Sequence, residues 1–398
     1  MRAVPRTLRL MNQRAVLDRL FREGPTTRAA LAEATGMSRP TSGLIIEELL
    51  GARVLEEGAL ATDGRPGRPG RSVMLERTTP RFLLIQIGVK HTDLAAVPVG
   101  GSPSDQWDES FKTPTSERAF LTELAAAVAR LDVRSRSLWA FAVSLPGLLD
   151  EARGKVLLSP NLHWTESAEL GTGIPASLRL PGCFVQEHRA MALGHIAATD
   201  DRDFLLIDSE DGVGAALVMD SQVFHSSLPT AGEIGHTTVL GNDRQCGCGG
   251  RGCLETLISR PALLAAFASA SRQPDAVWAD VVASLAARPD APRWLVSRLD
   301  ATAMVIGGAL NTSGLGRVLL AGALAELPAP IIQQLTRKIC DASLSGRLGL
   351  VTVECAPRRR TRGLLQAVFS RLLIPTTDWS KPCGATPVVP ARAAAGRN

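Results

Sequence analysis

The chain has 398 residues, of which 45% are hydrophobic and 21% charged, which is enough for two or three globular domains with a sizeable core. It contains no run of about 18 uncharged apolar residues, and its N-terminus lacks the apolar segment of a secretory signal. These features argue against a membrane-spanning helix and a secreted precursor, and we expect a cytoplasmic protein.

The positive charge is concentrated at the N-terminal end. Residues 1–80 contain 13 Arg, no Lys and 9 acidic residues, a net charge of +4, whereas the whole chain has a formal charge of +5. A basic N-terminal module joined to a nearly neutral body indicates a phosphate-backbone partner for the module alone.

Three helices are predicted within the first 50 residues, from the spacing of apolar residues and from capping signals. The first covers 12–21 and the second 28–34. After the turn at Gly36, Ser38 is expected to cap a third helix that runs to Leu50. Two short helices joined by a glycine-containing turn form a helix-turn-helix unit, whose second helix enters the DNA major groove.

The third helix begins with small or polar side chains that can reach base edges, and Arg39 is suited to bidentate contact with guanine. We predict DNA contacts from Ser38, Arg39, Thr41 and Ser42. Leu44 and the later apolar residues of this helix are expected to face inward.

A wing is predicted after the third helix. Strands over 54–57 and 72–75 are joined by the stiff, basic turn Gly-Arg-Pro-Gly-Arg-Pro-Gly-Arg at 64–71. Arg65 and Arg68 in this turn are expected to meet DNA phosphate or enter a minor groove. The alternative is an ordinary small helical domain followed by a flexible basic linker.

The rest of the chain alternates strand-length apolar runs with helical patterns, which predicts an α/β body of two lobes. The tail is rich in Pro, Ala and Gly and is expected to be disordered. We divide the chain into four parts: a winged helix-turn-helix DNA-binding domain (1–78), a first lobe (79–200), a second lobe (201–374) and the tail (375–398).

A cysteine-rich loop lies in the second lobe. His236, Cys246, Cys248 and Cys253 fall within eighteen positions, separated by glycines that let the backbone turn tightly. Three thiolates and one imidazole make a complete tetrahedral set for Zn²⁺, so the predicted site is structural rather than catalytic. The alternatives are buried apolar cysteines, or a disulfide with one spare thiol. Four other cysteines are expected to be small buried hydrophobes: Cys183, Cys340, Cys355 and Cys383.

One segment resembles the signature of the ROK family of bacterial sugar kinases and transcriptional repressors: Gly232-Glu233-x-Gly235-His236, then Cys246-x-Cys248-Gly249-x-x-Gly252-Cys253-Leu254-Glu255. The resemblance implies a two-lobed, actin-like and ribonuclease H-like body with a sugar pocket. It also implies, for the repressors, a winged helix-turn-helix with a Gly-Arg-Pro wing ahead of that body.

The resemblance further implies a set of sugar contacts: Asn161, Gln186, Glu187, Glu233, His236 and Glu255. Asn161 belongs to a Pro-Asn-x-x-Trp segment, and Gln186-Glu187 stands where the family's kinases have Asn-Asp. The changed pair leaves room for a different sugar, a sugar phosphate or another polar effector. The alternative for Glu233 and Glu255 is a helix-capping or surface role.

Kinase activity is not expected. Phosphoryl transfer needs a phosphate loop, a magnesium-binding carboxylate and a base. The family's kinases carry Asp-x-Gly-Gly-Thr after the first strand, whereas this chain has Gln86-Ile87-Gly88-Val89-Lys90. Glu187 replaces the aspartate base, and a displacement of about 1 Å can cost ~100-fold in rate. We therefore assign no catalytic residues.

The sequence thus predicts a zinc-stabilised transcriptional regulator, most often a repressor in this family, that responds to a sugar or sugar-derived effector. Its expected partner is double-stranded operator DNA, bound by a homodimer or a dimer of dimers. One competing hypothesis is an ATP-dependent sugar kinase with an attached DNA-binding module. Another is a regulator whose zinc domain serves only dimerisation and binds no ligand.

Overall fold

The computed structural model describes residues 5–61, 70–101, 106–131, 137–226 and 228–373. The predicted wing-tip residues Arg65 and Arg68, together with Cys383 and the 375–398 tail, lie outside the described residues. Within those described ranges, no helix is long and apolar enough to cross a membrane.

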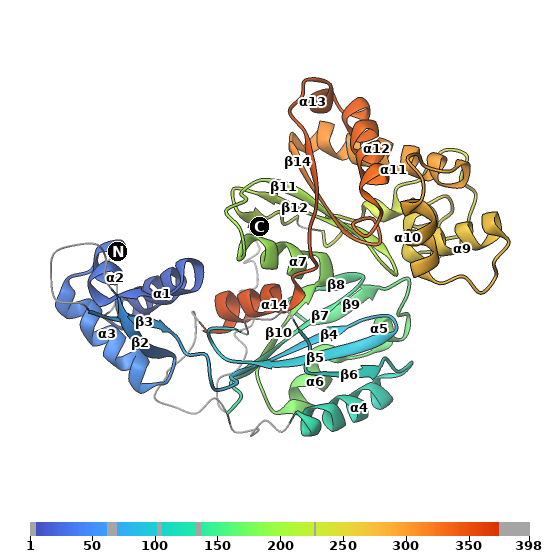
Figure 1. Ribbon diagram of the computed structural model, residues 1–398. Helices are drawn as coiled ribbons and strands as arrows, with labels where there is room; N and C mark the ends of the chain where they lie inside the picture. The colour runs from blue at the N-terminus through green and yellow to red at the C-terminus, as the bar shows by residue number, and fades with distance from the viewer. Residues whose placement is uncertain (1–4, 62–69, 102–105, 132–136, 227, 374–398) are drawn as a thin grey trace, which may run out of the picture.

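Three helices and a small antiparallel sheet form the N-terminal module (Figure 1). Its elements are α1 (Pro5–Glu23), β1 (Thr26–Thr27), α2 (Arg28–Ala34), α3 (Arg39–Gly51), β2 (Leu55–Ala61) and β3 (Gly70–Leu75). Strand β3 pairs with both β1 and β2, so the β2–β3 hairpin is positioned as the predicted wing. The predicted cap of α3 is confirmed, since Ser38 accepts a hydrogen bond from the backbone N–H of Thr41, and Thr27 caps α2 in the same way.

The buried face of α3 differs from the prediction. The buried side chains follow the i, i+3, i+4, i+7 spacing of one helix face: Ser42, Ile45, Ile46 and Leu49. Leu44 falls on the opposite side and is 76% exposed, whereas Ser42 is 1% exposed. The Ser42 hydroxyl therefore faces the core of the module, and its predicted contact with DNA is wrong.

The first lobe is built on a five-stranded sheet of order β10-β7-β4-β5-β6. Its strands are β4 (Phe82–Ile87), β5 (His91–Val97), β6 (Glu109–Lys112), β7 (Ala140–Leu145) and β10 (Gly182–Gln186). A separate hairpin comprises β8 (Leu148–Asp150) and β9 (Lys155–Leu158). The helices are α4 (Glu117–Arg130), α5 (Trp164–Ser167), α6 (Leu170–Leu178) and α7 (Glu187–Ile196).

The second lobe repeats the same strand arrangement, in the order β13-β12-β11-β14-β15. Its strands are β11 (Phe204–Ser209), β12 (Val213–Met219), β13 (Gln222–Val223), β14 (Arg317–Gly322) and β15 (Thr352–Cys355). Its helices are η1 (Ile234–His236), α8 (Glu255–Ile258), α9 (Arg260–Ser271), α10 (Trp278–Ala286), α11 (Arg293–Ser313), α12 (Ala329–Ala342) and α13 (Leu344–Arg347). In each sheet the first strand is central, its hairpin partner is antiparallel, and the later strands are parallel to it. This repeat is the expected actin-like body.

The C-terminal segment crosses back to the first lobe. Helix α14 (Arg360–Val368) and the following turn η2 (Phe369–Leu373) pack against α7 and against strands β4, β7 and β10 (Figure 1). The predicted assignment of all of 201–374 to the second lobe is therefore corrected. Residues 360–373 belong to the first lobe, because their apolar face completes its core.

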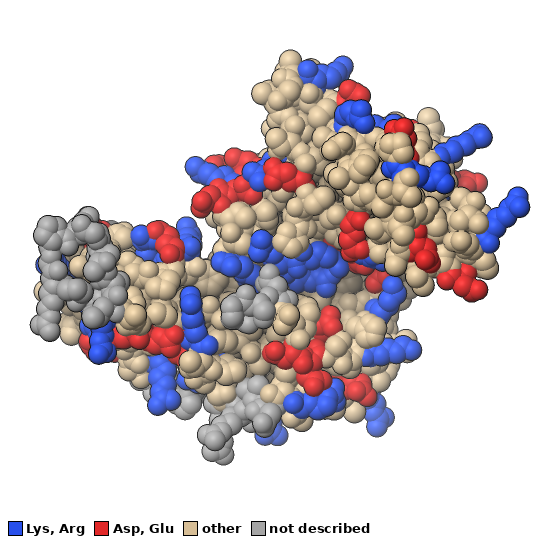
Figure 2. Space-filling model, in the orientation of Figure 1, with Lys and Arg blue, Asp and Glu red and all other residues tan. Residues whose placement is uncertain are grey.

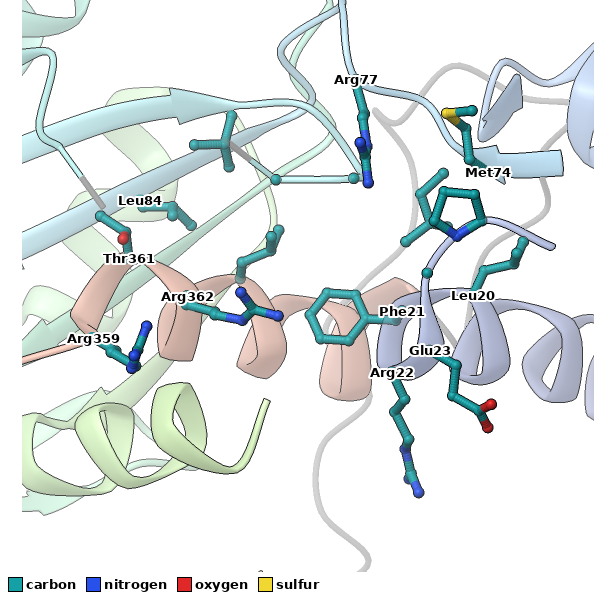
Figure 3. Close-up of a pocket in the computed structure, with 17 residues that line it drawn as sticks. Leu20, Phe21, Arg22, Glu23, Met74, Arg77, Leu84, Arg359, Thr361 and Arg362 are labelled. Atoms are coloured by element: carbon teal, nitrogen blue, oxygen red, sulfur yellow. The ribbon is translucent and has the colours of Figure 1, made fainter. Parts of the chain in front are cut away.

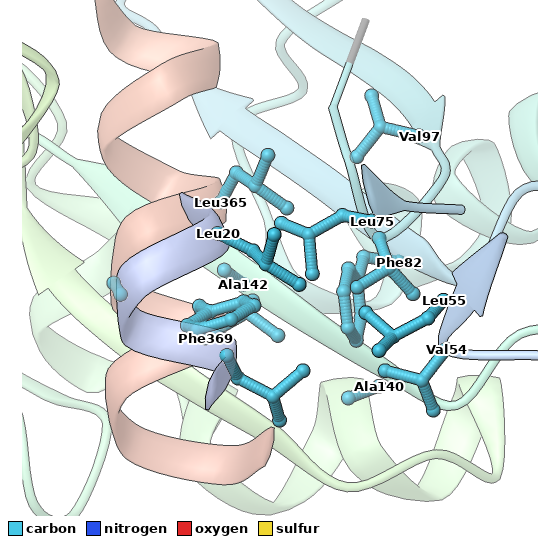
Figure 4. Packing of buried hydrophobic residues seen from close by; sticks show 14 of the residues in the cluster. Leu20, Val54, Leu55, Leu75, Phe82, Val97, Ala140, Ala142, Leu365 and Phe369 are labelled. Carbon is cyan, nitrogen blue, oxygen red and sulfur yellow. The ribbon is translucent and has the colours of Figure 1, made fainter. Parts of the chain in front are cut away.

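The N-terminal module and the first lobe share one hydrophobic core (Figure 4). Leu20, Leu55 and Leu75 of the module lie in the same cluster as Phe82 of β4 and Leu365 of α14. Burying apolar area in this way is the main stabilising contribution to packing between elements. The module is therefore fixed to the body by a continuous core as well as by the connecting chain.

Candidate functional site

The loop after β12 brings the four predicted metal ligands together. One ligand atom from each of His236, Cys246, Cys248 and Cys253 lies within 4.8 Å of the other three. Cys246 Sγ is 3.7 Å from His236 Nδ1, and Cys248 Sγ is 3.7 Å from Cys253 Sγ. A tetrahedral ion with Zn–S bonds of about 2.3 Å would place its sulfur ligands about 3.8 Å apart. The residues therefore fit Zn²⁺, whereas the sulfur atoms are too far apart for a disulfide of about 2.05 Å.

The backbone of this loop is shaped to hold the ligands. Bridges Thr238–Cys253 and Gln245–Arg251 close it into a narrow turn. Gly252 has φ +78°, and a Cβ there would lie 2.6 Å from the carbonyl oxygen of Asn242, so no other residue fits well. Burial raises the pKa of the Cys246 thiol to about 12 in the absence of a cation. A bound metal ion would hold it as thiolate.

His236 connects the metal ligands with the predicted sugar contacts. Its Nδ1 faces Cys246, while its Nε2 is 3.7 Å from an oxygen of Glu233. Burial, and secondly the neighbouring charge of Glu255, raises the pKa of Glu233 to about 7. A metal ion on one ring nitrogen would fix the imidazole and orient the other toward the carboxylates.

Glu255 and Asn161 meet beside Gly212, in the turn between β11 and β12. A Cβ at Gly212 would lie 2.9 Å from Glu255 Oε2 and 3.2 Å from Asn161 Nδ2. The Glu255 carboxylate also accepts a 2.9 Å hydrogen bond from the backbone N–H of Val213. The structure thus brings Asn161 of the first lobe to Glu255 of the second, and Glu233 and His236 adjoin Glu255. We call these four residues the polar cleft.

The other two predicted sugar contacts, Gln186 and Glu187, bond to residues outside the polar cleft. The Gln186 side chain caps α7, accepting from Arg189 N at 3.1 Å, and its amide nitrogen is 2.8 Å from His188 Nδ1. Glu187 is 8% exposed and pairs with Arg358 at 3.1 Å and Arg360 at 3.2 Å. Burial alone would raise the pKa of Glu187, but the two guanidinium groups lower it below its ordinary value.

Arg358 links the two lobes and was not predicted from the sequence. Lys and Arg side chains gather on the surface between the lobes, near α7 and α14 (Figure 2). Its Nη2 lies 2.5 Å from Asp208 at the end of β11 and 3.1 Å from Glu187 at the start of α7. Glu210 lies 3.8 Å from the same guanidinium. The signal available in the sequence was the run Pro357-Arg358-Arg359-Arg360 after the last strand, opposite acidic residues that follow β11.

The turn after β4 is joined to the turn after β11 in the other lobe. Lys90, in the turn after β4, forms a 2.7 Å ion pair with Asp211, in the turn after β11. Gln86 is fully buried, and its side chain is bonded to the hydroxyl of Ser144 on β7. Its amide therefore lies in the sheet instead of lining the space between these turns.

The start of α3 presents the remaining predicted DNA contacts. Ser38, Arg39 and Thr41 are exposed. No acidic side chain among the described residues pairs with Arg39, whereas Arg28 lies between Glu47 and Glu57 at 2.5 and 2.8 Å. An unpaired guanidinium at the start of an exposed helix retains its donors for a base or phosphate.

These features describe a two-lobed protein of the actin-like class, with a Cys₃His loop beside a polar cleft and a winged helix-turn-helix module ahead of it. The chain belongs to the ROK family, whose model matches residues 83–365. The family and fold predictions are thereby confirmed.

Two curated relatives are repressors or regulators. The chain is 24% identical over 274 residues to the xylose repressor of Caldicellulosiruptor bescii, covering 67% of this chain and 68% of that protein. It is 26% identical over 264 residues to the DNA-binding transcriptional dual regulator NagC of Escherichia coli K12, covering 64% of this chain and 63% of NagC. The alignment with NagC thus spans less than two thirds of that regulator.

Two solved structures share the fold. A ROK family transcriptional regulator, a homologue of the E. coli MLC protein, superposes with a TM-score of 0.69 at 20% identity, covering 90% of this chain and 96% of that one. A ROK family glucokinase from Streptomyces griseus, in complex with glucose and AMPPNP, gives 0.56 at 20% identity and covers 72% of this chain and 97% of the kinase.

Proposed function

We propose that this protein is a sugar-responsive transcriptional repressor of the ROK family without kinase activity. The observation that carries the proposal is the shared core that fixes a winged helix-turn-helix to a body containing a polar cleft. Repressors and a transcriptional regulator among the relatives support it.

In this proposal α3 reads double-stranded operator DNA through Ser38, Arg39 and Thr41, and the wing adds Arg65 and Arg68 from the segment outside the described residues. Arg39 supplies bidentate donors suited to guanine, and the two wing arginines supply charge for phosphate. A homodimer, or a dimer of dimers, would present two modules to a two-fold symmetric operator.

The polar cleft would hold a sugar or sugar-derived effector. Carboxylates, an amide and an imidazole can accept and donate the hydrogen bonds that several sugar hydroxyls need. Asn161 comes from one lobe and Glu255 from the other, so a bound polyol would favour one arrangement of the lobes. A structural Zn²⁺ on His236 and the three cysteines would keep His236 and Glu255 in place.

The proposal excludes phosphoryl transfer for physical reasons. Gln86 is bonded to Ser144 within the sheet and offers no carboxylate to hold a magnesium ion. Lys90 is occupied by Asp211, and Glu187 by Arg358 and Arg360. A base held by two guanidinium groups is a poor proton acceptor, because they stabilise its ionised form.

The ion pairs of Arg358 between the two lobes connect with the N-terminal module through packed helices. Glu187 opens α7, α7 packs against α14, and η2 after α14 contacts α1 of the module. Effector binding would change operator affinity only to the extent that the effector binds one arrangement of these elements more tightly than another.

A fluorescence anisotropy titration of the purified chain with promoter DNA from upstream of its own gene tests the proposal. Sequence-selective binding at moderate salt supports it, and its absence would end it. A coupled ATP assay over hexoses and N-acetylhexosamines tests the kinase alternative. Turnover in wild type that Glu187→Ala abolishes would revive that alternative. A thermal-shift screen with the same sugars would favour a regulator that binds no ligand if no sugar changes the Tm.

A further inference from the structure

A cavity of about 640 Å³ lies at the junction between the N-terminal module and the first lobe, well separated in sequence from the polar cleft (Figure 3). Its walls come from the end of α1 and from β3 on the module side, and from β4, β5 and the start of α14 on the body side. This volume is typical of pockets that take small molecules. None of the residues that form the polar cleft lines it.

The lining of this cavity is strongly basic. It includes four arginines, Arg22, Arg77, Arg359 and Arg362, and one acidic residue, Glu23. The Glu23 carboxylate is paired with Arg19 on the preceding turn of α1, so it does not neutralise them. No acidic side chain within the described parts of the chain pairs with Arg77 or Arg362. An excess of guanidinium groups in a concave site favours an anionic ligand.

Two of these arginines face each other across the space. Arg77, just after β3, and Arg362, on the first turn of α14, point into the cavity from opposite walls, whereas Arg22 points away (Figure 3). One nitrogen of Arg362 donates a 2.6 Å hydrogen bond to the backbone oxygen of Ala197. That bond holds the guanidinium in position and leaves its other N–H groups for a ligand.

The other lining residues indicate what the uncharged part of the ligand is like. Apolar side chains of Leu20, Phe21, Leu84 and Leu365 lie along the cavity, and they suit an uncharged body better than a second charge. The first turn of α14 adds the positive end of a helix dipole, since Thr361 lines the space. We propose that this junction cavity is an effector site for a small phosphorylated metabolite, with its phosphate between Arg77 and Arg362.

The position of the cavity gives such a ligand a regulatory effect. Arg77 lies at the end of the module and Arg362 belongs to the body, so binding of the phosphate depends on how the module and the body are placed relative to each other. A ligand bound there stabilises the arrangement of module and body in this structure. By linkage, the factor by which the ligand changes the affinity for DNA equals the factor by which DNA changes the affinity for the ligand. A small molecule fits better than a DNA backbone, because the module and the body bound the cavity from two sides.

The test uses the full-length protein without DNA, so it does not depend on the proposed repressor function. Isothermal titration at low ionic strength compares glucose 6-phosphate, inorganic phosphate and glucose, with wild type and the double variant Arg77→Gln/Arg362→Gln. Both arginines are exposed, so the double variant should fold. The matched control is Arg337→Gln, an exposed arginine on α12 of the second lobe.

We expect a phosphorylated probe to bind wild type and Arg337→Gln alike, and to bind the double variant at least tenfold more weakly. Unphosphorylated glucose should show no difference between these variants. The proposal is overturned if neither phosphorylated probe binds at millimolar concentration. Equal binding to the double variant also overturns it, since the phosphate would then lie elsewhere, in the polar cleft for example.

Discussion

The ring of Phe21, near the end of α1, lies 4.6 Å from the ring of Phe369, centroid to centroid, at an interplanar angle of 34°. The two residues are separated by almost the whole chain, yet they join the N-terminal module to the segment that follows α14. Such aromatic pairs are stabilising beyond the area they bury. The contact explains how the module is held at a fixed position on the first lobe.

Replacing Phe369 by Ala should therefore loosen the junction. Phe369 is 1% exposed, and removing a buried phenyl ring costs about 3–5 kcal/mol. Urea unfolding should report that loss, and limited proteolysis should cut faster between β3 and β4.

The matched control is Phe267→Ala, in the core of the second lobe. It should also lower the free energy of unfolding, without increasing cleavage at the junction. Equal protection of the β3–β4 segment in both variants would contradict a shared core.

Removing one predicted zinc ligand should unfold the loop that carries Glu233 and Glu255. In Cys253→Ser we expect loss of stoichiometric zinc by elemental analysis and a lower Tm, because binding energy at a structural site is folding energy. A chelator should lower the Tm of wild type in the same way. Cys340→Ser, a half-buried cysteine outside the cluster, should keep its zinc. A wild-type protein purified without zinc would refute the site.

Two neighbouring positions on α3 should behave differently toward DNA. Arg39→Ala should weaken operator binding by about 1–3 kcal/mol and relax specificity at one base pair, because it removes a base-edge donor. Ser42→Ala should leave operator affinity unchanged, since Ser42 is buried in the module. Anisotropy titrations at several salt concentrations separate the two. An effect of Ser42→Ala equal to that of Arg39→Ala would show that α3 is oriented differently on DNA.

Arg358→Met should destabilise the contact between the lobes. It would leave Asp208, which is 1% exposed, without its 2.5 Å partner. Breaking a buried ion pair by removing one member costs about 3–5 kcal/mol. Thermal and urea unfolding measure the loss.

Arg202→Met is the comparison for that variant, because Arg202 and Asp220 form an exposed pair. Surface pairs contribute about 0–1 kcal/mol, so this change should hardly alter the free energy of unfolding. Similar losses in the two variants would mean that Arg358 contributes no more than a surface charge.

Much of the fold could be predicted because local signals agree with the final structure. Thr27 and Ser38 are strong caps, the apolar hairpins form the sheets, and four ligands in one loop need only local folding to meet. The face of α3 was harder to predict, since a small residue such as Ser42 carries no hydrophobic signal even when buried.

Long-range relationships had no sequence pattern that could specify them. Residues 360–373 read as one more helix of the second lobe, and only the packing of α14 on α7 shows where they belong. The same holds for Arg358, whose three acidic neighbours come from α7 and from the end of β11. Tertiary contacts between distant segments decide such positions.

The central claim is that the module selects DNA under control of a sugar bound in the body. The direct measurement is sequencing of genomic fragments retained by the purified full-length protein at moderate salt, with and without each candidate sugar. The account predicts one enriched two-fold symmetric sequence, bound about 10³-fold or more above random DNA, and one sugar that changes its recovery at least fivefold. Recovery of unrelated fragments in proportion to their abundance, unchanged by any sugar, would contradict it.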